Sequence, residues 1–206
     1  MAAQPATPVQ LLFTPLESEL LKEVQALRRD PPAYATLLEQ ERLPMYEADG
    51  TTLKVDNETF TRTREGKAAC EAAIAFLRSQ PANTLSEVVP SYGMSLAARD
   101  AVATQGASGT VGNVTADGKE LPTSLDLMDD RGYVTGNSAE VCGYGGRNGR
   151  AMVFSFLIGD GDQSRTYRRV LLDPRWGAIG IGAGEHKSDY KVMAVLNFAE
   201  KYRDRA

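Results

Sequence analysis

The reactive side chains of this sequence limit its chemistry more than any motif does. The chain has one histidine, His186, so no site within a single copy can use two imidazoles. A nucleophilic triad would have to combine His186 with Ser108 or Cys142, and neither stands in a pattern that activates a nucleophile. Because His186 lies in a polar stretch between two β-rich runs, we expect a hydrogen-bonded loop histidine rather than a catalytic one.

Short motifs for metals and phosphates are incomplete. Asp160, Asp162 and Ser164 alternate like the first ligands of a calcium loop, but the glycine and the distal acid that such a loop requires are absent. The glycine-rich stretch 143–149 lacks the Gly-Lys-Ser/Thr ending of a phosphate-binding loop. The two cysteines and the histidine are scattered without the paired spacing of a zinc site. We therefore expect no cofactor and no structural metal.

Composition places the chain among ordinary globular domains. Its 206 residues are 42% apolar and 24% charged, with a net charge of -4. A single core accommodates this length, and the absence of a basic surplus argues against binding nucleic acid through phosphates. No apolar run is long enough to span a membrane. The N-terminus lacks the basic and apolar regions of a signal peptide, so we expect a cytoplasmic protein with reduced thiols.

Apolar periodicity predicts the elements that position the reactive residues. Amphipathic helical spacing covers four segments: 14–30, 30–38, 65–77 and 94–104. Two β-rich runs, 176–181 and 191–198, are joined by a polar turn, which predicts an antiparallel pair. We expect loops over 45–62 and 106–149, and 150–158 fits either a helix or a strand. Helices followed by strands indicate an α+β fold, with an extended lead over 1–13 and a single domain over 14–206.

An ordered series of short segments resembles a known family. The series consists of Asp30-Pro31-Pro32-Ala33-Tyr34-Ala35, Met94-Ser95-Leu96-Ala97-Ala98-Arg99-Asp100, Thr115-Ala116-Asp117-Gly118, the run 157–168, and the final runs 180–190 and 195–199. In this order the segments are similar to the CAP superfamily (cysteine-rich secretory proteins, antigen 5 and pathogenesis-related 1), also called SCP. The resemblance implies a three-layer α-β-α sandwich with a mostly antiparallel sheet. It also implies a cleft that often holds two histidines and two acids able to bind a divalent metal.

When those four cleft positions are aligned with this sequence, acidic residues stand at the two acidic positions, but no histidine stands at the two histidine positions. The resemblance aligns the acids with Glu140 and Asp160, and the histidines with Asn113 and Tyr167. A further histidine of the family's helix corresponds to Ala101. Zinc prefers nitrogen and sulfur donors, and a tyrosine of ordinary pKa is rarely ionised. We therefore expect a degenerate tetrad, without catalytic or metal-binding residues, in which the two acids support a buried polar network.

The leading functional hypothesis is a non-enzymatic binding or structural module. The Pro/Ala-rich lead would be floppy alone, and Leu11, Leu12 and Phe13 form an apolar patch beside the first helix. We expect this patch to hold a protein partner. The partner would belong to a larger intracellular assembly, such as a cytoskeletal or ciliary one.

Two alternatives from other classes remain open. A hydrolase would use Glu140 and Asp160 as a carboxylate pair for general acid–base catalysis. A lipid- or sterol-binding module, which some CAP relatives are, would need a continuous apolar groove, and Phe154 and Phe156 are the candidate lining residues.

Overall fold

The computed structural model describes residues 12–205; the sequence-predicted lead over 1–13 therefore lies almost wholly outside the described residues. The elements, in chain order, are α1 (Pro15–Arg29), α2 (Pro31–Leu37), the π-helical turn η1 (Leu38–Arg42), the 3-10 turn η2 (Leu43–Met45), β1 (Thr52–Lys54), β2 (Phe60–Arg62), α3 (Lys67–Arg78), β3 (Val89–Pro90), α4 (Tyr92–Ser108), α5 (Ser124–Asp129), β4 (Gly132–Tyr144), α6 (Gly149–Ile158), α7 (Thr166–Leu171), β5 (Ala178–Glu185) and β6 (Val192–Asp204).

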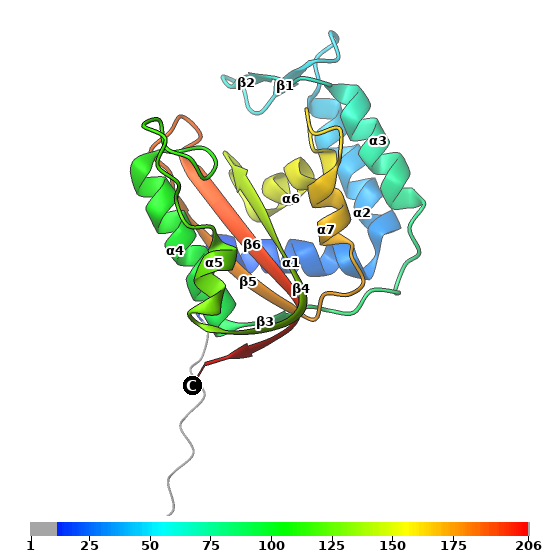
Figure 1. Ribbon diagram of the computed structural model, residues 1–206. Helices are drawn as coiled ribbons and strands as arrows, with labels where there is room; N and C mark the ends of the chain where they lie inside the picture. Colours follow the sequence, from blue (N-terminus) through cyan, green and yellow to red (C-terminus); the bar gives the residue numbers. More distant parts are fainter. Residues whose placement is uncertain (1–11, 206) are drawn as a thin grey trace, which may run out of the picture.

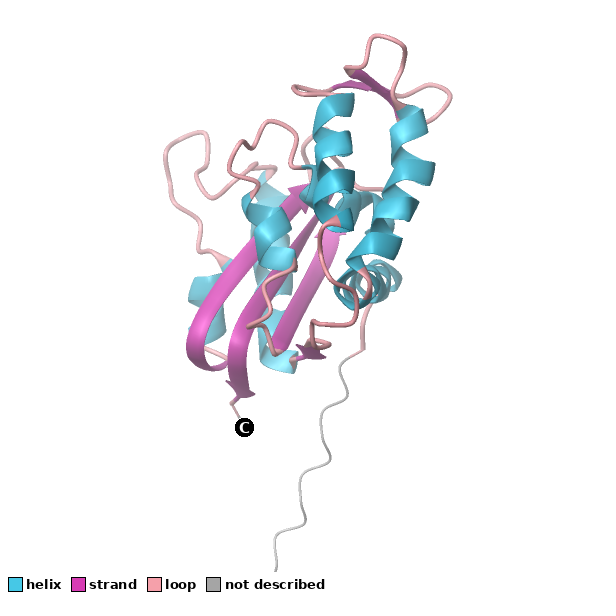
Figure 2. Ribbon diagram, turned by 90° about the vertical axis from the view of Figure 1, so that its right-hand side faces the viewer, coloured by secondary structure: helices cyan, strands magenta, loops and turns pink. Residues whose placement is uncertain are grey.

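A four-stranded sheet forms the centre of the fold. Its strand order is β3-β5-β6-β4, with β6 antiparallel to both β4 and β5, and with the short β3 parallel to β5. Helices α4 and α5 cover one face, whereas α1, α6 and α7 lie on the other (Figures 1 and 2). The predicted α+β class with a mostly antiparallel sheet between helical layers is confirmed.

The first helix forms for the local reasons that its sequence predicts. The Thr14 side chain accepts a hydrogen bond from the Glu17 N–H, and the Glu17 carboxylate accepts one from the Thr14 N–H, which together form a capping box. Leu20, Val24 and Leu27 share one face of the helix and are fully buried. Pro31 then ends the helix and begins α2, which Asp30 caps through the Ala33 N–H.

Two glycines of β5 allow α4 to pack closely on the sheet. A Cβ atom at Gly180 would lie 2.3 Å from the carbonyl carbon of Met94, and one at Gly182 would lie 2.4 Å from that of Ala98. No larger residue fits where two backbones approach so closely. The glycines of this strand therefore serve close packing.

Two predicted loops contain regular structure, and those predictions are wrong. The segment 45–62 holds the β1–β2 hairpin, and 106–149 holds α5 and the thirteen-residue strand β4. Strand β4 is the edge of the sheet, and most of its residues are exposed or half-buried, so its sequence lacks an apolar alternation. Pairing with β6 from Gly132 to Tyr144 supplies the structure that local propensity does not. The ambiguous segment 150–158 belongs to helix α6, which Asn148 caps.

Candidate functional site

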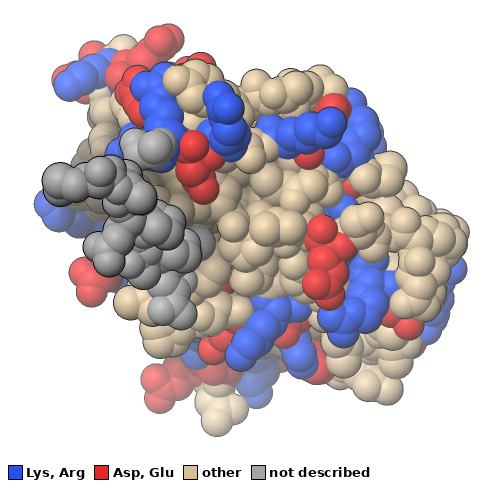
Figure 3. All heavy atoms as spheres, turned by 90° about the horizontal axis from the view of Figure 1, so that it is seen from below, with Lys and Arg blue, Asp and Glu red and all other residues tan. Residues whose placement is uncertain are grey.

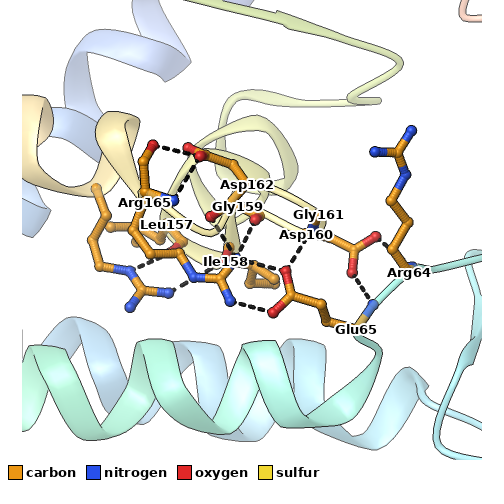
Figure 4. Close-up of polar contacts among 11 residues, drawn as sticks. Arg64, Glu65, Leu157, Ile158, Gly159, Asp160, Gly161, Asp162 and Arg165 are labelled. Carbon is orange, nitrogen blue, oxygen red and sulfur yellow. Dashed lines mark hydrogen bonds and ion pairs between the residues drawn. The ribbon is translucent and has the colours of Figure 1, made fainter.

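Asp160, one of the two predicted cleft acids, bonds to the segment that leads into helix α3. Its Oδ2 accepts a hydrogen bond from the Arg64 N–H at 2.8 Å, and its Oδ1 accepts one from the Glu65 N–H at 2.7 Å. Figure 4 shows this carboxylate facing the segment that leads into α3. Among the described residues, neither Arg165 nor Arg168 pairs with it: Arg165 pairs with Glu65, and Arg168 donates to the carbonyls of Leu157 and Ile158.

The loop that carries Asp160 is fixed by a second carboxylate, that of Glu65. Glu65 accepts hydrogen bonds from the Gly161 N–H at 2.8 Å and from both terminal nitrogens of Arg165 (Figure 4). The hydrogen bonds from Arg165 hold the pKa of Glu65 below its usual value. Arg165 also donates to the Gly159 and Asp162 carbonyls, which joins the α6–α7 connection to α3.

Glu140, the other predicted acid, serves a different element. It lies on β4, and its Oε2 accepts hydrogen bonds from the Ser124 N–H at 2.9 Å and the Ser124 hydroxyl at 2.5 Å. The same hydroxyl lies 2.5 Å from the Asn197 Oδ1 on the neighbouring strand β6. The arrangement ties the first turn of α5 to the sheet. Ser124 and Asn197 are buried, but Glu140 is half-buried and Asp160 is exposed, so the predicted buried network of both acids is present only in part.

Asn113 and Tyr167, the two positions that the resemblance aligns with histidines, also lie apart. The Asn113 Oδ1 accepts a hydrogen bond from the Gln105 Nε2 at 2.9 Å, and the Tyr144 hydroxyl donates to the Gln105 Oε1 at 3.0 Å. The Tyr167 ring packs edge-on against Phe156, with 5.8 Å between the ring centroids. Burial raises the pKa of Tyr167, so its hydroxyl stays protonated at neutral pH.

The four cleft positions therefore do not assemble into one ligand set. Asp160 and Tyr167 line a common cavity, whereas Glu140 and Asn113 are absent from its lining and are bonded elsewhere. Within residues 12–205, no group of three or more histidine, cysteine, aspartate or glutamate side chains could hold a metal ion.

The cavity that Asp160 and Tyr167 line has a volume of about 580 Å³. Its lining residues come from the β1–β2 hairpin, the end of β4, helix α6 and the α6–α7 loop. An adjoining cavity of about 370 Å³ shares part of the wall. The apolar part of the main cavity consists of Leu53, Met152, Phe156 and Ile158. Its polar part includes the hydroxyls of Thr61, Thr63, Ser155 and Thr166, the carboxylates of Asp160 and Asp162, and the guanidinium of Arg42.

The residues that supply the charged and aromatic parts of this cavity wall carry little signal in the sequence. Arg42 and Tyr46 follow the second helix, and Tyr144 ends the strand β4 that was predicted as a loop. A buried arginine has no sequence signature of its own. The one available signal is that Arg42 follows Leu38 by four residues, which places it on the buried side of a helical segment.

The nucleophile and base candidates do not meet at the cavity. His186 is buried away from its lining, with Nδ1 2.7 Å from the Ser188 hydroxyl and Nε2 3.0 Å from the Thr110 carbonyl oxygen. The predicted role of His186 as a hydrogen-bonded loop residue is confirmed. Cys142 lines the cavity, but burial raises the pKa of its thiol to about 11, so the reactive thiolate is scarce at neutral pH.

The residues proposed to bind partners or lipids differ in accessibility. Leu11 lies outside the described residues, Leu12 is 75% exposed, and Phe13 packs partly buried against the main core. The Arg99 guanidinium donates to the Leu12 carbonyl at 2.7 Å and fixes the chain there. Phe154 and Phe156 are both core residues, although each contributes to one of the two cavities.

No family model matches this chain, and no curated protein matches it. Three solved structures are similar. An extracellular protein containing an SCP domain from Bacillus anthracis is 16% identical with a TM-score of 0.44, over 64% of this chain and 38% of its own. An outer surface protein from Borrelia burgdorferi is 14% identical with a TM-score of 0.44, over 56% of this chain and 78% of its own.

The third similar structure is a cysteine-rich secretory protein from Staphylococcus aureus. It is 14% identical with a TM-score of 0.40, over 72% of this chain and 44% of its own. This chain therefore spans less than half the length of two of the three structures that it matches. Similarity at this level carries no information about activity, substrate or partner. No helix within the described part of the chain is long and apolar enough to cross a membrane.

Proposed function

We propose that this chain is a non-enzymatic binding module of CAP-like architecture, in which the family's ligand positions have taken structural roles. The observation that carries this proposal is that both predicted cleft acids accept hydrogen bonds from main-chain N–H groups. Asp160 holds the entry to α3, and Glu140 holds the first turn of α5. A carboxylate used in this way has fewer lone pairs left for a metal ion or for the activation of water, and moving it toward either would strain the segment that it holds.

Neutralising each acid tests the absence of catalysis. The variants Glu140→Gln and Asp160→Asn are assayed with the wild type on ester, amide and glycoside substrates, and their melting temperatures are measured in parallel. We expect both variants to melt at lower temperature and neither to abolish a turnover that the wild type shows. Turnover that disappears in Glu140→Gln, while the variant stays folded, would establish the hydrolase instead.

Equilibrium dialysis against zinc tests the metal independently. We expect less than stoichiometric zinc in the wild type, because the tetrad offers no imidazole and its two acids lie apart. Zinc bound at one equivalent, and lost in both acid variants, would contradict the proposal.

The proposed partner is a protein in a larger intracellular assembly, cytoskeletal or ciliary in kind. Support comes from Leu12, a large apolar side chain that is 75% exposed where the lead joins α1. On the face in Figure 3, basic and acidic side chains are interspersed, and neither sign forms a broad patch. That distribution suits a protein surface better than a phosphate backbone.

Sedimentation of the tagged chain from its own cells tests the assembly. We expect the wild type to sediment well above its 22.3 kDa monomer mass, and Leu12→Ser to sediment as the monomer. Phe13 is unsuitable for this test because its ring packs against the core. An unchanged profile for Leu12→Ser would exclude this residue as the anchor.

A second candidate function is the binding of a small apolar ligand, and the cavity favours it. Its volume of about 580 Å³ lies within the range of roughly 300–1,000 Å³ for ligand pockets. Four apolar side chains and several hydroxyls line it, a common composition for such pockets.

A further inference from the structure

Arg42 is a buried cation with almost none of its hydrogen bonds formed. It ends η1 and is 8% exposed. A guanidinium has five N–H groups, and among the described residues Arg42 makes one hydrogen bond, from Nη2 to the Ala151 carbonyl at 3.1 Å. Its Nε is sealed from solvent without a partner, and no other buried side-chain nitrogen or oxygen within the described residues is left so.

No acidic side chain neutralises this cation within residues 12–205. Glu41, its neighbour in sequence, pairs with Arg150 at 2.6 Å. The titratable groups whose charge bears on Arg42 are those of Tyr46 and Cys70. Burial raises the pKa of Tyr46 to about 12 and that of Cys70 to about 11, so both are neutral at physiological pH.

This charge, which has no acidic partner and lies 5.9 Å from the centroid of the Phe154 ring, is at a cavity wall. Arg42 lines both the 580 Å³ cavity and the adjoining 370 Å³ cavity, together with Tyr144 and Leu53. Leaving a buried charge unpaired is costly, and groups that cost stability are often those that a ligand uses. Arg42 therefore supplies the second observation, independent of the cavity's shape, that a ligand belongs there.

We propose that Arg42 is an anion-binding residue of this cavity and that its ligand is a carboxylate carried on an apolar, ring-sized body. The inference rests on the proposed role of the cavity in binding a small ligand and names the ligand's chemistry. A planar guanidinium matches a carboxylate well. The apolar body would contact Leu53, Met152 and Phe156 on the remaining wall.

The other charges of the cavity limit the ligand to a single negative charge. The carboxylates of Asp160 and Asp162 line the same space, and both are held by hydrogen bonds to main-chain N–H groups. A polyphosphate would meet one free cation and two fixed anions, whereas a monocarboxylate can approach Arg42 and avoid both aspartates. The cavity therefore disfavours nucleotides.

A pair of probes of equal shape separates charge recognition from apolar binding. The ligands 2-naphthoate and 2-naphthamide share one ring system and differ in charge, and their affinities are measured by titration calorimetry. We expect the wild type to prefer the carboxylate by about tenfold, the size of one charge-assisted hydrogen bond. Arg42→Met should remove that preference, leave naphthamide binding within about twofold, and melt no lower than the wild type.

Arg147→Met is the matched control. Arg147 lines the adjoining cavity, but its guanidinium is paired with Asp56. This variant should keep the preference for naphthoate, because the cation that it removes is already neutralised. Loss of the preference in Arg147→Met would mean that general surface charge, and not Arg42, selects the anion.

Two results would overturn the assignment. Equal affinity of the wild type for both probes would show that the cavity binds apolar ligands whatever their charge. That result would leave the proposed binding of small ligands intact and refute the anion site. Binding of neither probe would overturn the small-ligand role as well, while the dialysis and turnover tests of the acids would still decide whether the chain is an enzyme. Should Arg42→Met fail to fold, the Nε–H resonance of Arg42 in the wild type decides: naphthoate should shift it and naphthamide should not, and no shift would refute the site.

Discussion

Two buried arginines, fourteen residues apart in sequence, differ in how many of their hydrogen bonds are formed. Arg28 on α1 is 1% exposed and donates to the carbonyls of Leu171, Asp173 and Ser86 at 2.9 to 3.3 Å. Arg42 is 8% exposed and donates to one carbonyl, with its Nε left without a partner.

This contrast distinguishes a charged group whose hydrogen bonds hold the fold together from one that is free to bind a ligand. At the base of α1, carbonyl oxygens satisfy the guanidinium and join the helix to the segments around Ser86 and Asp173. At the cavity wall, the same chemical group has no counter-ion and faces open volume. A buried charge contributes to stability when its hydrogen bonds are complete and reduces stability when they are not.

Replacing Arg28 should give the largest effect. Arg28→Met removes the donor from the carbonyls of Leu171, Asp173 and Ser86, of which that of Leu171 is buried, and should lower the free energy of unfolding by about 3 kcal/mol. Urea denaturation measures this change directly. A loss below about 1 kcal/mol would mean that these hydrogen bonds contribute little, and the contrast with Arg42 would fail.

Glu17 extends the comparison to a buried acid, also on α1. It is fully buried and accepts hydrogen bonds from Arg99 at 2.8 and 2.9 Å and from the Thr14 N–H. We expect Glu17→Gln to lower the free energy of unfolding by about 2 kcal/mol at neutral pH, because Arg99 then loses its charged partner.

The effect of Glu17 should depend on pH with a definite sign. Burial alone would raise its pKa, but the hydrogen bonds from Arg99 and Thr14 outweigh burial and hold the pKa below the ordinary value of 4.5. The folded state thus favours the ionised form, so its stabilisation is complete above pH 4.5 and disappears as the pH falls through the lower, folded-state pKa. Melting curves of wild type and Glu17→Gln should converge in acid; a gap that widens there would contradict the assignment.

A smaller effect is expected at the start of α6, the helix against which Arg42 lies. The Asn148 Oδ1 accepts a hydrogen bond from the Ala151 N–H at 2.8 Å, which caps the helix. Asn148→Ala should cost about 1 kcal/mol, whereas Asn148→Asp should be nearly neutral because it also caps well. Equal losses in both variants, measured by thermal unfolding, would mean that the amide has another role.

The smallest effect on stability should come from Arg42 itself. Arg42→Met removes an unpaired charge and one hydrogen bond, so we expect the free energy of unfolding to stay unchanged or to rise by about 1 kcal/mol. The measurement is the same urea titration as for Arg28→Met. A loss near that of Arg28→Met would show that Arg42 is structural and would remove the distinction between the two regions.

Local patterns predicted much of the helical half of the fold. The capping box at Thr14, the proline that separates α1 from α2, and the apolar face through Cys70 all act within one or two turns, so the sequence displays them. The final strand pair was equally readable, because β5 and β6 are buried and joined by a short turn. Strand β4 was not, because an exposed edge strand obtains its structure from its partner and not from its own alternation.

The candidate site was predicted in part for the same reason. The resemblance to the CAP family led to four positions, and the spacing of those positions said nothing about their partners. Only the tertiary structure shows that Glu140 faces Ser124 while Asp160 faces the entry to α3. Arg42 escaped notice because an arginine in a helical segment is usually exposed.

By itself, the sequence determined the first three helices approximately, the antiparallel pair near the C-terminus, and the presence of a single imidazole, since each depends on residue type or short-range spacing. The tertiary structure decided which charged groups are satisfied and which are not. Burial and hydrogen-bond partners arise where distant segments meet. Arg28 therefore became a structural residue bonded to distant carbonyls, whereas Arg42 kept a buried donor without a partner.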